Sequence, residues 1–393
     1  MSSYRTPQLA RVILAGAIVL LVVHTLGRFI YTPMLPLLIA DGYLTVQQGA
    51  DVATWNYIGY LVGAMLAIRW SSVAQIQRTL PMALAVNVLC TLLQTQAESF
   101  AMLAFLRLIS GISNGLVFVQ APALILEWLV RKGRASTSGL MFLGIGAGLI
   151  FSSVLVSSTA GWLVGPQRWW PAFIASVPLA WWGWRQLAQL DIPPFAAADK
   201  EAAPPSSKLL DGASIPLFLA YAGGGLGYIL PMTFLPTLVA EMPDVPAFLH
   251  SGNWMLVALA TLPSPWLWNK AGVLMGDAPA LRLNYALQAM GVLAVLVLPS
   301  GWGVVLCSLL VGATFVGTVL LTLRIARALQ PHQGPRLSAA LVALYGITQL
   351  LGPWLTKLWL NAGGTLQSAF WLGAGALLWG FLWALKVPNS ASV

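Results

Sequence analysis

The segment GRFIYTPMLPLLIAD, residues 27–41, returns in altered form as GYILPMTFLPTLVAE, residues 227–241. The two segments share a leading glycine, the dipeptide LP before an aliphatic run, and an acidic residue at the end. Both copies are almost wholly apolar, as a helix inside a lipid bilayer must be. The sequence therefore predicts two related membrane-embedded halves.

The composition excludes an ordinary soluble domain. Hydrophobic residues make up 58% of the 393 residues and charged residues 8%, against about 25% charged residues in a typical soluble domain. Apolar stretches of about 20 residues recur along the whole chain, and we expect twelve transmembrane helices. The expected spans are 9–39, 47–70, 79–97, 99–130, 135–158, 169–188, 214–241, 247–268, 280–298, 302–328, 338–360 and 366–386.

One long polar segment divides these spans into six and six. Residues 189–212, QLDIPPFAAADKEAAPPSSKLLDG, are rich in proline, alanine and charged residues, which is typical of a linker. We therefore expect an all-helical membrane protein with two pseudo-symmetric six-helix halves, residues 1–188 and 213–393, joined by a cytoplasmic linker.

The basic residues indicate the orientation in the membrane. Most of the 20 Lys and Arg residues fall on one side of the expected spans, for example Arg131, Lys132 and Arg134, whereas the acidic Asp41 and Asp51 fall on the other. This asymmetry predicts that both termini are cytoplasmic. It also accounts for the net charge of +9 without a nucleic-acid partner.

Arg28 and Arg107 lie deep inside expected spans, where a charge costs at least about 2.5 to 3.5 kcal/mol. The second half carries no charge at the matching positions, because Arg28 aligns with Tyr228 and Arg107 with Ser308. The fold therefore does not require these charges, which favours a guanidinium site for an anionic group. For Arg107 a structural role is an equally good interpretation.

Further candidates for substrate contact share the depth of the two arginines or face them. His24 lies one helical turn before Arg28 on the same face. No acidic residue lies deep in a span, so His24 or Asp51 takes a coupling proton, or the substrate itself carries it, or transport is uncoupled, and the sequence does not decide among these. For His24 a neutral core histidine is an equal alternative. The other candidates, each with packing as its alternative role, are Tyr31, Asn56, Tyr60, Asn114, Tyr228, Asn253, Trp254, Tyr345 and Gln349.

Prolines and glycines predict bending and close packing. Prolines at related positions of the first and seventh spans permit these helices to bend as gates, with inert kinks as the alternative. Paired small residues predict close helix packing. The prolines are Pro33, Pro36, Pro231 and Pro236, and the glycines are Gly111 with Gly115 and Gly144 with Gly148.

The cysteines and an outer lysine carry no predicted chemistry. Cys90 and Cys307 lie in apolar spans, so we expect small core side chains rather than a disulfide or a metal site. Lys357 lies near the outer end of its span and is expected to reach the lipid headgroups. We expect no cofactor and no metal.

Several stretches resemble the major facilitator superfamily, and more narrowly its YbfB/YjiJ-type branch of bacterial inner-membrane transporters. They occur in the expected order along nearly the whole chain. The resemblance implies a central cavity between two halves, secondary transport by alternating access, and a monomer. The stretches are GRFIYTPMLPLL (27–38), WNYIGYLVGA (55–64), RLISGISNG (107–115), EWLVRKGRASTSG (127–139), GYILPMTFLP (227–236) and YGITQLLGP (345–353).

The chain departs from the superfamily pattern in two places. Ala67 stands where the superfamily carries an acid near the inner end of the second span, so the gating ion-pair cluster is reduced to Arg69 with Glu127 and Arg131. The segment GLMFLGIGAG, residues 139–148, lacks the Gly-Pro pair typical of proton-coupled drug exporters of the superfamily. The second departure weakens a drug-exporter interpretation.

The sequence thus predicts a secondary carrier for a small organic solute, expected to be anionic, with the lipid bilayer as its environment. An exporter of hydrophobic or cationic compounds fits the 18 tryptophans but conflicts with the buried arginines. A membrane-embedded enzyme is a more remote alternative, because His24, His250 and His332 adjoin no carboxylate or cysteine that would form a catalytic site.

Overall fold

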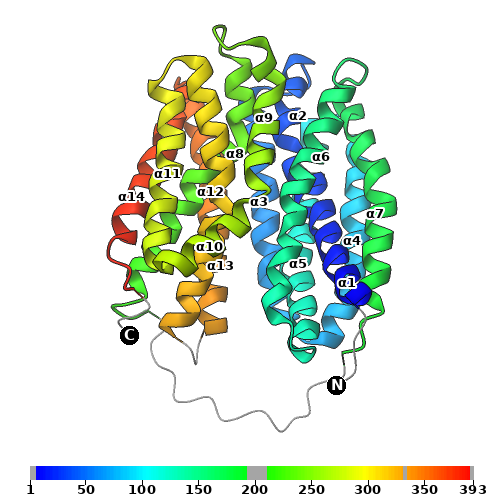
Figure 1. Cartoon of the computed structure of the whole chain (residues 1–393). Helices are drawn as coiled ribbons and strands as arrows, with labels where there is room; N and C mark the ends of the chain where they lie inside the picture. The colour runs from blue at the N-terminus through cyan, green and yellow to red at the C-terminus, as the bar shows by residue number, and fades with distance from the viewer. Residues whose placement is uncertain (1–5, 193–209, 331–333, 390–393) are drawn as a thin grey trace.

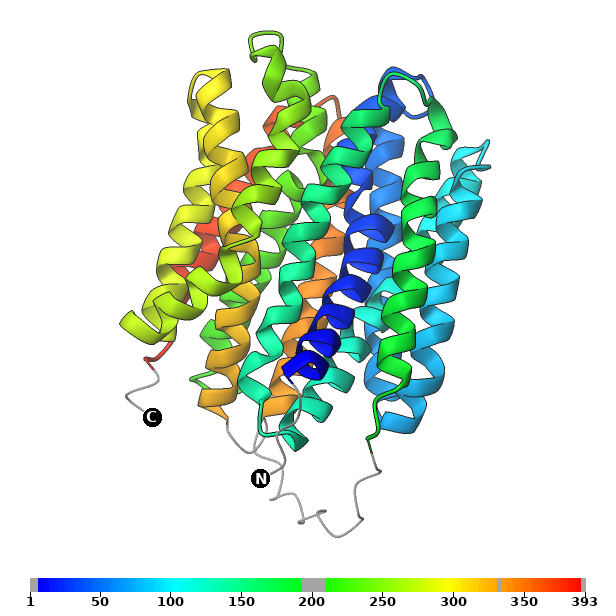
Figure 2. The same cartoon turned by 45° about the vertical axis from the view of Figure 1, so that its right-hand side comes forward.

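The computed structural model describes residues 6–192, 210–330 and 334–389, and within these ranges it contains helices and no strand. The axes of most helices lie roughly parallel to one another, and successive long helices cross the bundle in opposite directions. The first helix begins at the end of the bundle where the last helix ends (Figures 1 and 2). We call this the terminal end and the opposite one the distal end. Most of the linker expected at residues 189–212 lies outside the described residues.

The first group of helices covers residues 6–188 and contains two short 3-10 helices, η2 and η3. Its elements are α1 Thr6–Leu20, η1 Leu21–Phe29, α2 Tyr31–Ala40, α3 Val46–Arg69, α4 Val73–Gln94, α5 Phe100–Arg131, η2 Ala135–Phe142, α6 Leu143–Thr159, η3 Gly165–Trp169 and α7 Trp170–Ala188. Side-chain caps explain several helix starts: the hydroxyls of Thr45, Ser72 and Ser99 each accept a backbone N–H of the first turn.

The second group covers residues 215–384, and one expected span in it is wrong. Its elements are α8 Ile215–Ala240, α9 Ala247–Thr261, α10 Ser264–Met275, α11 Asp277–Val297, α12 Ser300–Leu329, α13 Gly334–Asn361 and α14 Leu366–Ala384. The stretch expected as one span at 247–268 is two helices, because Pro263 has no backbone N–H and interrupts the ladder. From this point α10 runs obliquely to α9 (Figure 1).

The first expected span is a composite helix rather than a regular one. Its middle portion, η1, is a π-helix in which the Ile30 backbone N–H donates 2.7 Å to the Thr25 carbonyl five residues back. Regular α-helix resumes at Tyr31, and Pro33 follows within its first turn. A π segment inside a membrane helix widens the backbone locally and is frequent at functional sites.

Glycines allow α3 and α5 to pack in close contact. A Cβ added at Gly59 or Gly63 would collide with backbone of α5, and one at Gly111 or Gly115 would collide with backbone of α3. The close packing expected for Gly111 and Gly115 is thus confirmed. It is confirmed as well for Gly144 and Gly148, which face Ala17 and Thr25 of the first span.

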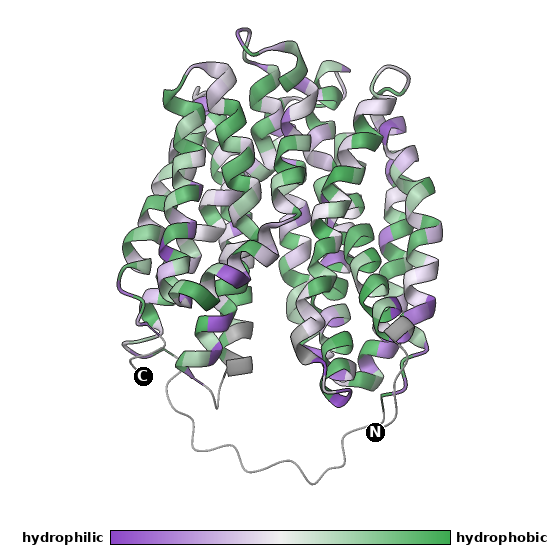
Figure 3. Cartoon of the chain, in the orientation of Figure 1, coloured by the Kyte–Doolittle hydropathy of each residue, from purple (hydrophilic) through white to green (hydrophobic). Residues whose placement is uncertain are grey.

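Lipid-facing surfaces follow from hydropathy. Eight stretches of the described residues are long and apolar enough to span a membrane by length and composition. The other expected spans coincide with α3, α7, α9 with α10, and α13, which carry more polar or tryptophan residues. Hydrophobic residues cover most of the helix surfaces, and strongly hydrophilic ones are most frequent near the helix ends (Figure 3). Large apolar side chains such as Met65, Met82 and Phe105 are exposed outward, as lipid contact requires.

The two groups meet through α3 with α13, α2 with α8, and α6 with α9. Toward the terminal end the groups diverge (Figure 1). A site between the two groups is therefore covered where these helix pairs are in contact.

Candidate functional site

Arg28 lies on η1 at the contact between the two groups. Its guanidinium is buried, with 2% exposure, and Nη2 donates 2.5 Å to the Gln349 Oε1 atom of α13. The guanidinium carbon lies 4.3 Å from the Tyr60 ring centroid and 4.5 Å from that of Tyr57. Both of these distances are within the range of cation–π attraction.

No acidic side chain of the described residues forms an ion pair with Arg28. Its Nε atom is also buried without a hydrogen-bond partner. Burying an ion costs several kcal/mol, and an amide oxygen with two ring faces offsets only part of that cost. Arg28 is therefore a buried cation whose charge an anion would neutralise.

Arg107 is placed differently, because it bonds the backbone of the π-helix. Its Nη1 donates 2.8 Å to the Gly27 carbonyl and its Nη2 donates 3.1 Å to the Arg28 carbonyl. Pro33 has no N–H to donate to the Arg28 carbonyl in the π-helical register, and the Arg107 side chain donates to this carbonyl. Of the two interpretations that the sequence left open for Arg107, this geometry favours the structural one.

His24 lies in an aromatic cluster. Its ring stacks on Phe118 with centroids 4.4 Å apart and meets the edge of Phe29 at 5.0 Å. It has no carboxylate within ion-pair distance in the described part of the chain. This environment suits a neutral, packed ring.

The second group presents a column of nearly parallel rings. Tyr221 stacks on Tyr345 with centroids 4.2 Å apart, Tyr345 lies 5.4 Å from Tyr228, and Tyr228 lies 5.7 Å from Phe315, with interplanar angles of 15°, 11° and 3°. We call these four residues the ring column. Gln349 follows Tyr345 by one turn of α13, so the column adjoins the Arg28 contact.

Sequence reasoning named Tyr228 and Tyr345 but missed Tyr221 and Phe315. Tyr221 precedes Tyr228 by two helical turns on α8, and that spacing is the signal that could have found it. Phe315 lies on α12 and carries no comparable signal, since only the packing of α8 against α12 brings it there.

Most other candidate side chains bond helix backbones. Asn56 donates 2.8 Å to the Arg107 carbonyl, Asn114 donates 2.9 Å to the Val23 carbonyl, and Asn253 donates to carbonyls of its own helix. Two others hold neighbouring helices: Tyr31 donates 3.0 Å to the Gly49 carbonyl, and the Trp254 Nε1 atom donates 3.3 Å to the Ser152 hydroxyl across the two groups.

At the distal end an ion pair joins the two groups. The Lys357 Nζ atom of α13 lies 2.6 Å from the Asp51 Oδ2 atom of α3. Lys357 was expected to reach the lipid headgroups, whereas in the structure its ammonium group pairs with the Asp51 carboxylate. Nearer the middle, the Thr32 hydroxyl donates 2.7 Å to the Met232 carbonyl, so equivalent positions of the repeated segments touch.

The expected gating residues at the terminal end do not bridge the groups through an ion pair among the described side chains. Glu127 and Arg131 pair at 2.9 Å within α5. Arg69 is exposed at the end of α3.

The expected gating prolines Pro231 and Pro236 lie inside a continuous α8, and Pro36 lies inside α2.

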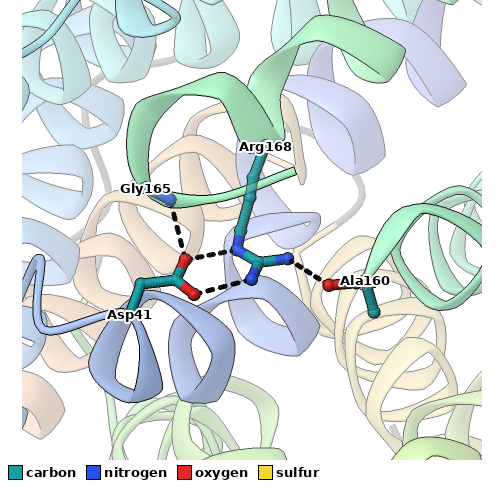
Figure 4. A network of polar contacts seen from close by, with 4 residues as sticks. All are labelled: Asp41, Ala160, Gly165 and Arg168. Carbon is teal, nitrogen blue, oxygen red and sulfur yellow. Dashed lines mark hydrogen bonds and ion pairs between the residues drawn. The ribbon is translucent and has the colours of Figure 1, made fainter. Parts of the chain in front are cut away.

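A third arginine, Arg168, lies at the distal end of the first group, and all three of its guanidinium nitrogens have hydrogen-bond partners. Arg168 of η3 contacts Asp41 through Nε at 2.6 Å and Nη2 at 2.8 Å, while the Gly165 N–H donates 2.7 Å to the same carboxylate and Arg168 Nη1 donates 3.2 Å to the Ala160 carbonyl (Figure 4). These hydrogen bonds lower the pKa of Asp41 from its ordinary value. The pair ties α2 to the chain that follows α6.

No cluster of three or more metal-ligating side chains occurs in the described part of the chain. Both cysteines are buried and free, as expected for core residues.

Comparison with known proteins gives the following matches. The model of the family described as "Uncharacterised MFS-type transporter YbfB" matches residues 20–385. Two curated proteins of Mycobacterium tuberculosis, the uncharacterized MFS-type transporters MT1926 (strain CDC 1551 / Oshkosh) and Rv1877 (strain ATCC 25618 / H37Rv), are 25% identical over 179 residues. This match covers 44% of the chain and 25% of each relative, so the chain corresponds to about a quarter of their length.

Solved structures resemble the whole chain. The nucleoside transporter NupG has a TM-score of 0.70 at 12% identity and covers 96% of this chain and 98% of its own. A D-xylose-proton symporter has a TM-score of 0.72 at 15% identity and covers 97% and 98%. At these identities the likeness shows the fold.

Proposed function

Because this chain belongs to the YbfB-type family of the major facilitator superfamily and so is a transmembrane transporter, we propose that it moves a small organic anion across the bacterial inner membrane. Transport proceeds by alternating access between two six-helix halves, residues 1–188 and 213–393. The termini and the linker at 189–212 face the cytoplasm, and the protein works as a monomer.

One observation supports the anionic substrate: the buried guanidinium of Arg28 forms no ion pair with an acid of the described residues. Its hydrogen bond to Gln349 joins the two halves at 2.5 Å. A substrate carboxylate is a stronger acceptor than an amide oxygen and would replace Gln349 on the guanidinium. The bond that links the halves would then break as the substrate binds, which couples occupancy to rocking.

The distal ion pair supplies the candidate for proton coupling. Protonation of Asp51 would remove the charge that holds Lys357, and this pair joins α3 to α13. Protonation of His24 would instead place a second cation beside Arg28 inside an aromatic cluster. The proposal therefore assigns the coupling proton to Asp51.

The test combines ligand binding with transport in reconstituted vesicles. The probes are acetate, pyruvate, gluconate and benzoate as acids, uridine and D-xylose as neutral compounds, and tetraphenylphosphonium as a cation. Ligand-induced rises in melting temperature identify binders. The variants are Arg28→Gln and Arg28→Lys, with Arg168→Gln as the matched control, since Arg168 is also a buried arginine but lies at Asp41.

We expect at least one acid to stabilise and to be transported by the wild type and by Arg168→Gln. Arg28→Gln loses a charge-assisted hydrogen bond worth about 1.5 to 3 kcal/mol, so binding of that acid weakens about 10- to 150-fold. Arg28→Lys keeps the charge and retains part of the affinity. Equal binding of the acid by wild type and Arg28→Gln, or binding of the neutral or cationic probes alone, contradicts the proposal.

A further inference from the structure

We infer that the anion carried by this protein has a flat, aromatic body, held between Arg28 and the ring column. This inference rests on the proposed anion transport and deepens it. Two features support it: the ring faces that flank Arg28, and the parallel rings of the column beside them.

The guanidinium of Arg28 is held among ring faces. The ring centroids of Tyr57 and Tyr60 both lie within 4.5 Å of the guanidinium carbon, and the ring centroid of Phe29 lies 5.1 Å from it. A carboxylate that forms two hydrogen bonds to a guanidinium lies in its plane. When that carboxylate is conjugated to a ring, the ring continues the same plane, so a flat acid extends the surface that the tyrosines already pack against.

The ring column offers a second flat surface beside the first. Gln349, which bonds Arg28, and Tyr345, at the middle of the column, are one turn apart on α13. An acid that displaces Gln349 from Arg28 therefore has its body directed to the neighbourhood of Tyr345. Aromatic rings gain attraction from offset stacking beyond their burial of apolar area.

One tyrosine of the column differs in its hydrogen bonding from a core tyrosine of the same half. The Tyr345 hydroxyl is buried without a hydrogen-bond partner, on a side chain that is 6% exposed. Tyr285, a core tyrosine of the same half, donates its hydroxyl 2.8 Å to the Ala220 carbonyl. A buried hydroxyl without a partner is costly unless a ligand supplies one. The Nε atom of Arg28, on the guanidinium that bonds Gln349, is likewise buried without a hydrogen-bond partner among the described residues.

The experiment compares flat acids with their saturated counterparts. Binding of benzoate and indole-3-carboxylate to the purified, detergent-solubilised full chain is measured by calorimetry beside cyclohexanecarboxylate, the saturated counterpart of benzoate. Benzamide is the neutral flat probe. The variants are Tyr228→Leu in the column and Tyr345→Phe, which keeps the ring and removes the hydroxyl. Tyr285→Leu is the matched control, because it removes a buried ring outside the column.

We expect the flat acids to bind about threefold to tenfold more tightly than the saturated ones, the range that aromatic stacking supplies. Tyr228→Leu removes this preference, and Tyr285→Leu keeps it. Tyr345→Phe preserves the preference for flat acids, since the rings remain stacked. The comparison within the wild type stands even if a variant fails to fold.

The outcomes separate the inference from the proposed function. Equal affinity for flat and saturated acids overturns the aromatic inference and leaves the anion carrier in place. Benzamide binding as tightly as benzoate overturns the anion site and the inference with it. Failure of every acid to bind, flat or saturated, likewise overturns both.

Discussion

The stability of the protein should respond differently to removal of the charges of Arg28 and Arg107. In Arg107→Met, the carbonyls of Gly27 and Arg28 lose the charge-assisted donors at 2.8 and 3.1 Å. Each such bond contributes about 1.5 to 3 kcal/mol, about 3 to 6 kcal/mol for both, and relief of the desolvation cost of the buried Arg107 cation offsets part of this sum. The free energy of unfolding should still fall, because the Arg28 carbonyl loses its side-chain donor and the Gly27 carbonyl keeps only Ser110.

Arg28→Met removes one such hydrogen bond, to Gln349, and three cation–π contacts, with Phe29, Tyr57 and Tyr60. The same substitution also removes the desolvation cost of a buried ion that no acid offsets, and that cost is several kcal/mol. The two effects nearly cancel, so the free energy of unfolding should change by less than about 2 kcal/mol. Ligand binding, by contrast, should be lost.

Unfolding of the two variants by denaturant in detergent micelles, followed by the fluorescence of the 18 tryptophans, measures the difference. Far-ultraviolet circular dichroism checks that each variant keeps its helix content. If Arg107→Met is as stable as the wild type, the structural role of Arg107 is refuted. A loss of several kcal/mol in Arg28→Met would show that Arg28 is a structural residue rather than an unmatched anion site.

Three further predictions concern the ends and the packing of the bundle. Asp51→Asn or Lys357→Gln removes a partly exposed ion pair that contributes about 0.2 to 1 kcal/mol to the contact between the two groups. The rate at which a thiol reagent labels a cysteine introduced at the distal end should therefore rise about 1.4- to 5-fold. Reversing both charges should restore the wild-type labelling rate. Arg168 lowers the pKa of Asp41 below its ordinary 3.8. The resulting stabilisation is therefore present above about pH 4 and is lost as the pH falls through the lower folded-state pKa. Melting temperatures of Asp41→Asn should lack this acid-dependent loss, and a parallel pH profile in both proteins would contradict it. Gly63→Ala places a methyl group against the α5 backbone and should destabilise the protein by about 1 to 3 kcal/mol, whereas an unchanged unfolding midpoint would refute the close contact.

Prediction from the sequence succeeded where hydropathy and repetition carry the information. The all-helical fold, the membrane-spanning character and the family followed from apolar runs and from motifs such as the segment at 27–38. It failed where backbone detail matters. The break at Pro263 and the π-helix before Pro33 depend on which carbonyls find other donors, and an apolar count cannot register that.

The candidate site was predicted only in part. The failure of the repeat at Arg28 pointed to a special residue, since its twin, Tyr228, is uncharged. Roles were harder to assign, because a partner such as Gln349 lies 321 residues away along the chain. The same limit hid the pairing of Lys357 with Asp51.

The sequence by itself determined that this chain is a helical membrane protein with a repeated plan and charges deep in one half, because hydropathy and period are local properties of the chain. The tertiary structure alone decided that Arg107 bonds the backbone of η1 while Arg28 bonds Gln349 of the other half. Two arginines of the same type and similar depth differ only in what the folded helices place beside them. Their chemistry is therefore set by three-dimensional neighbours, which the order of residues does not display.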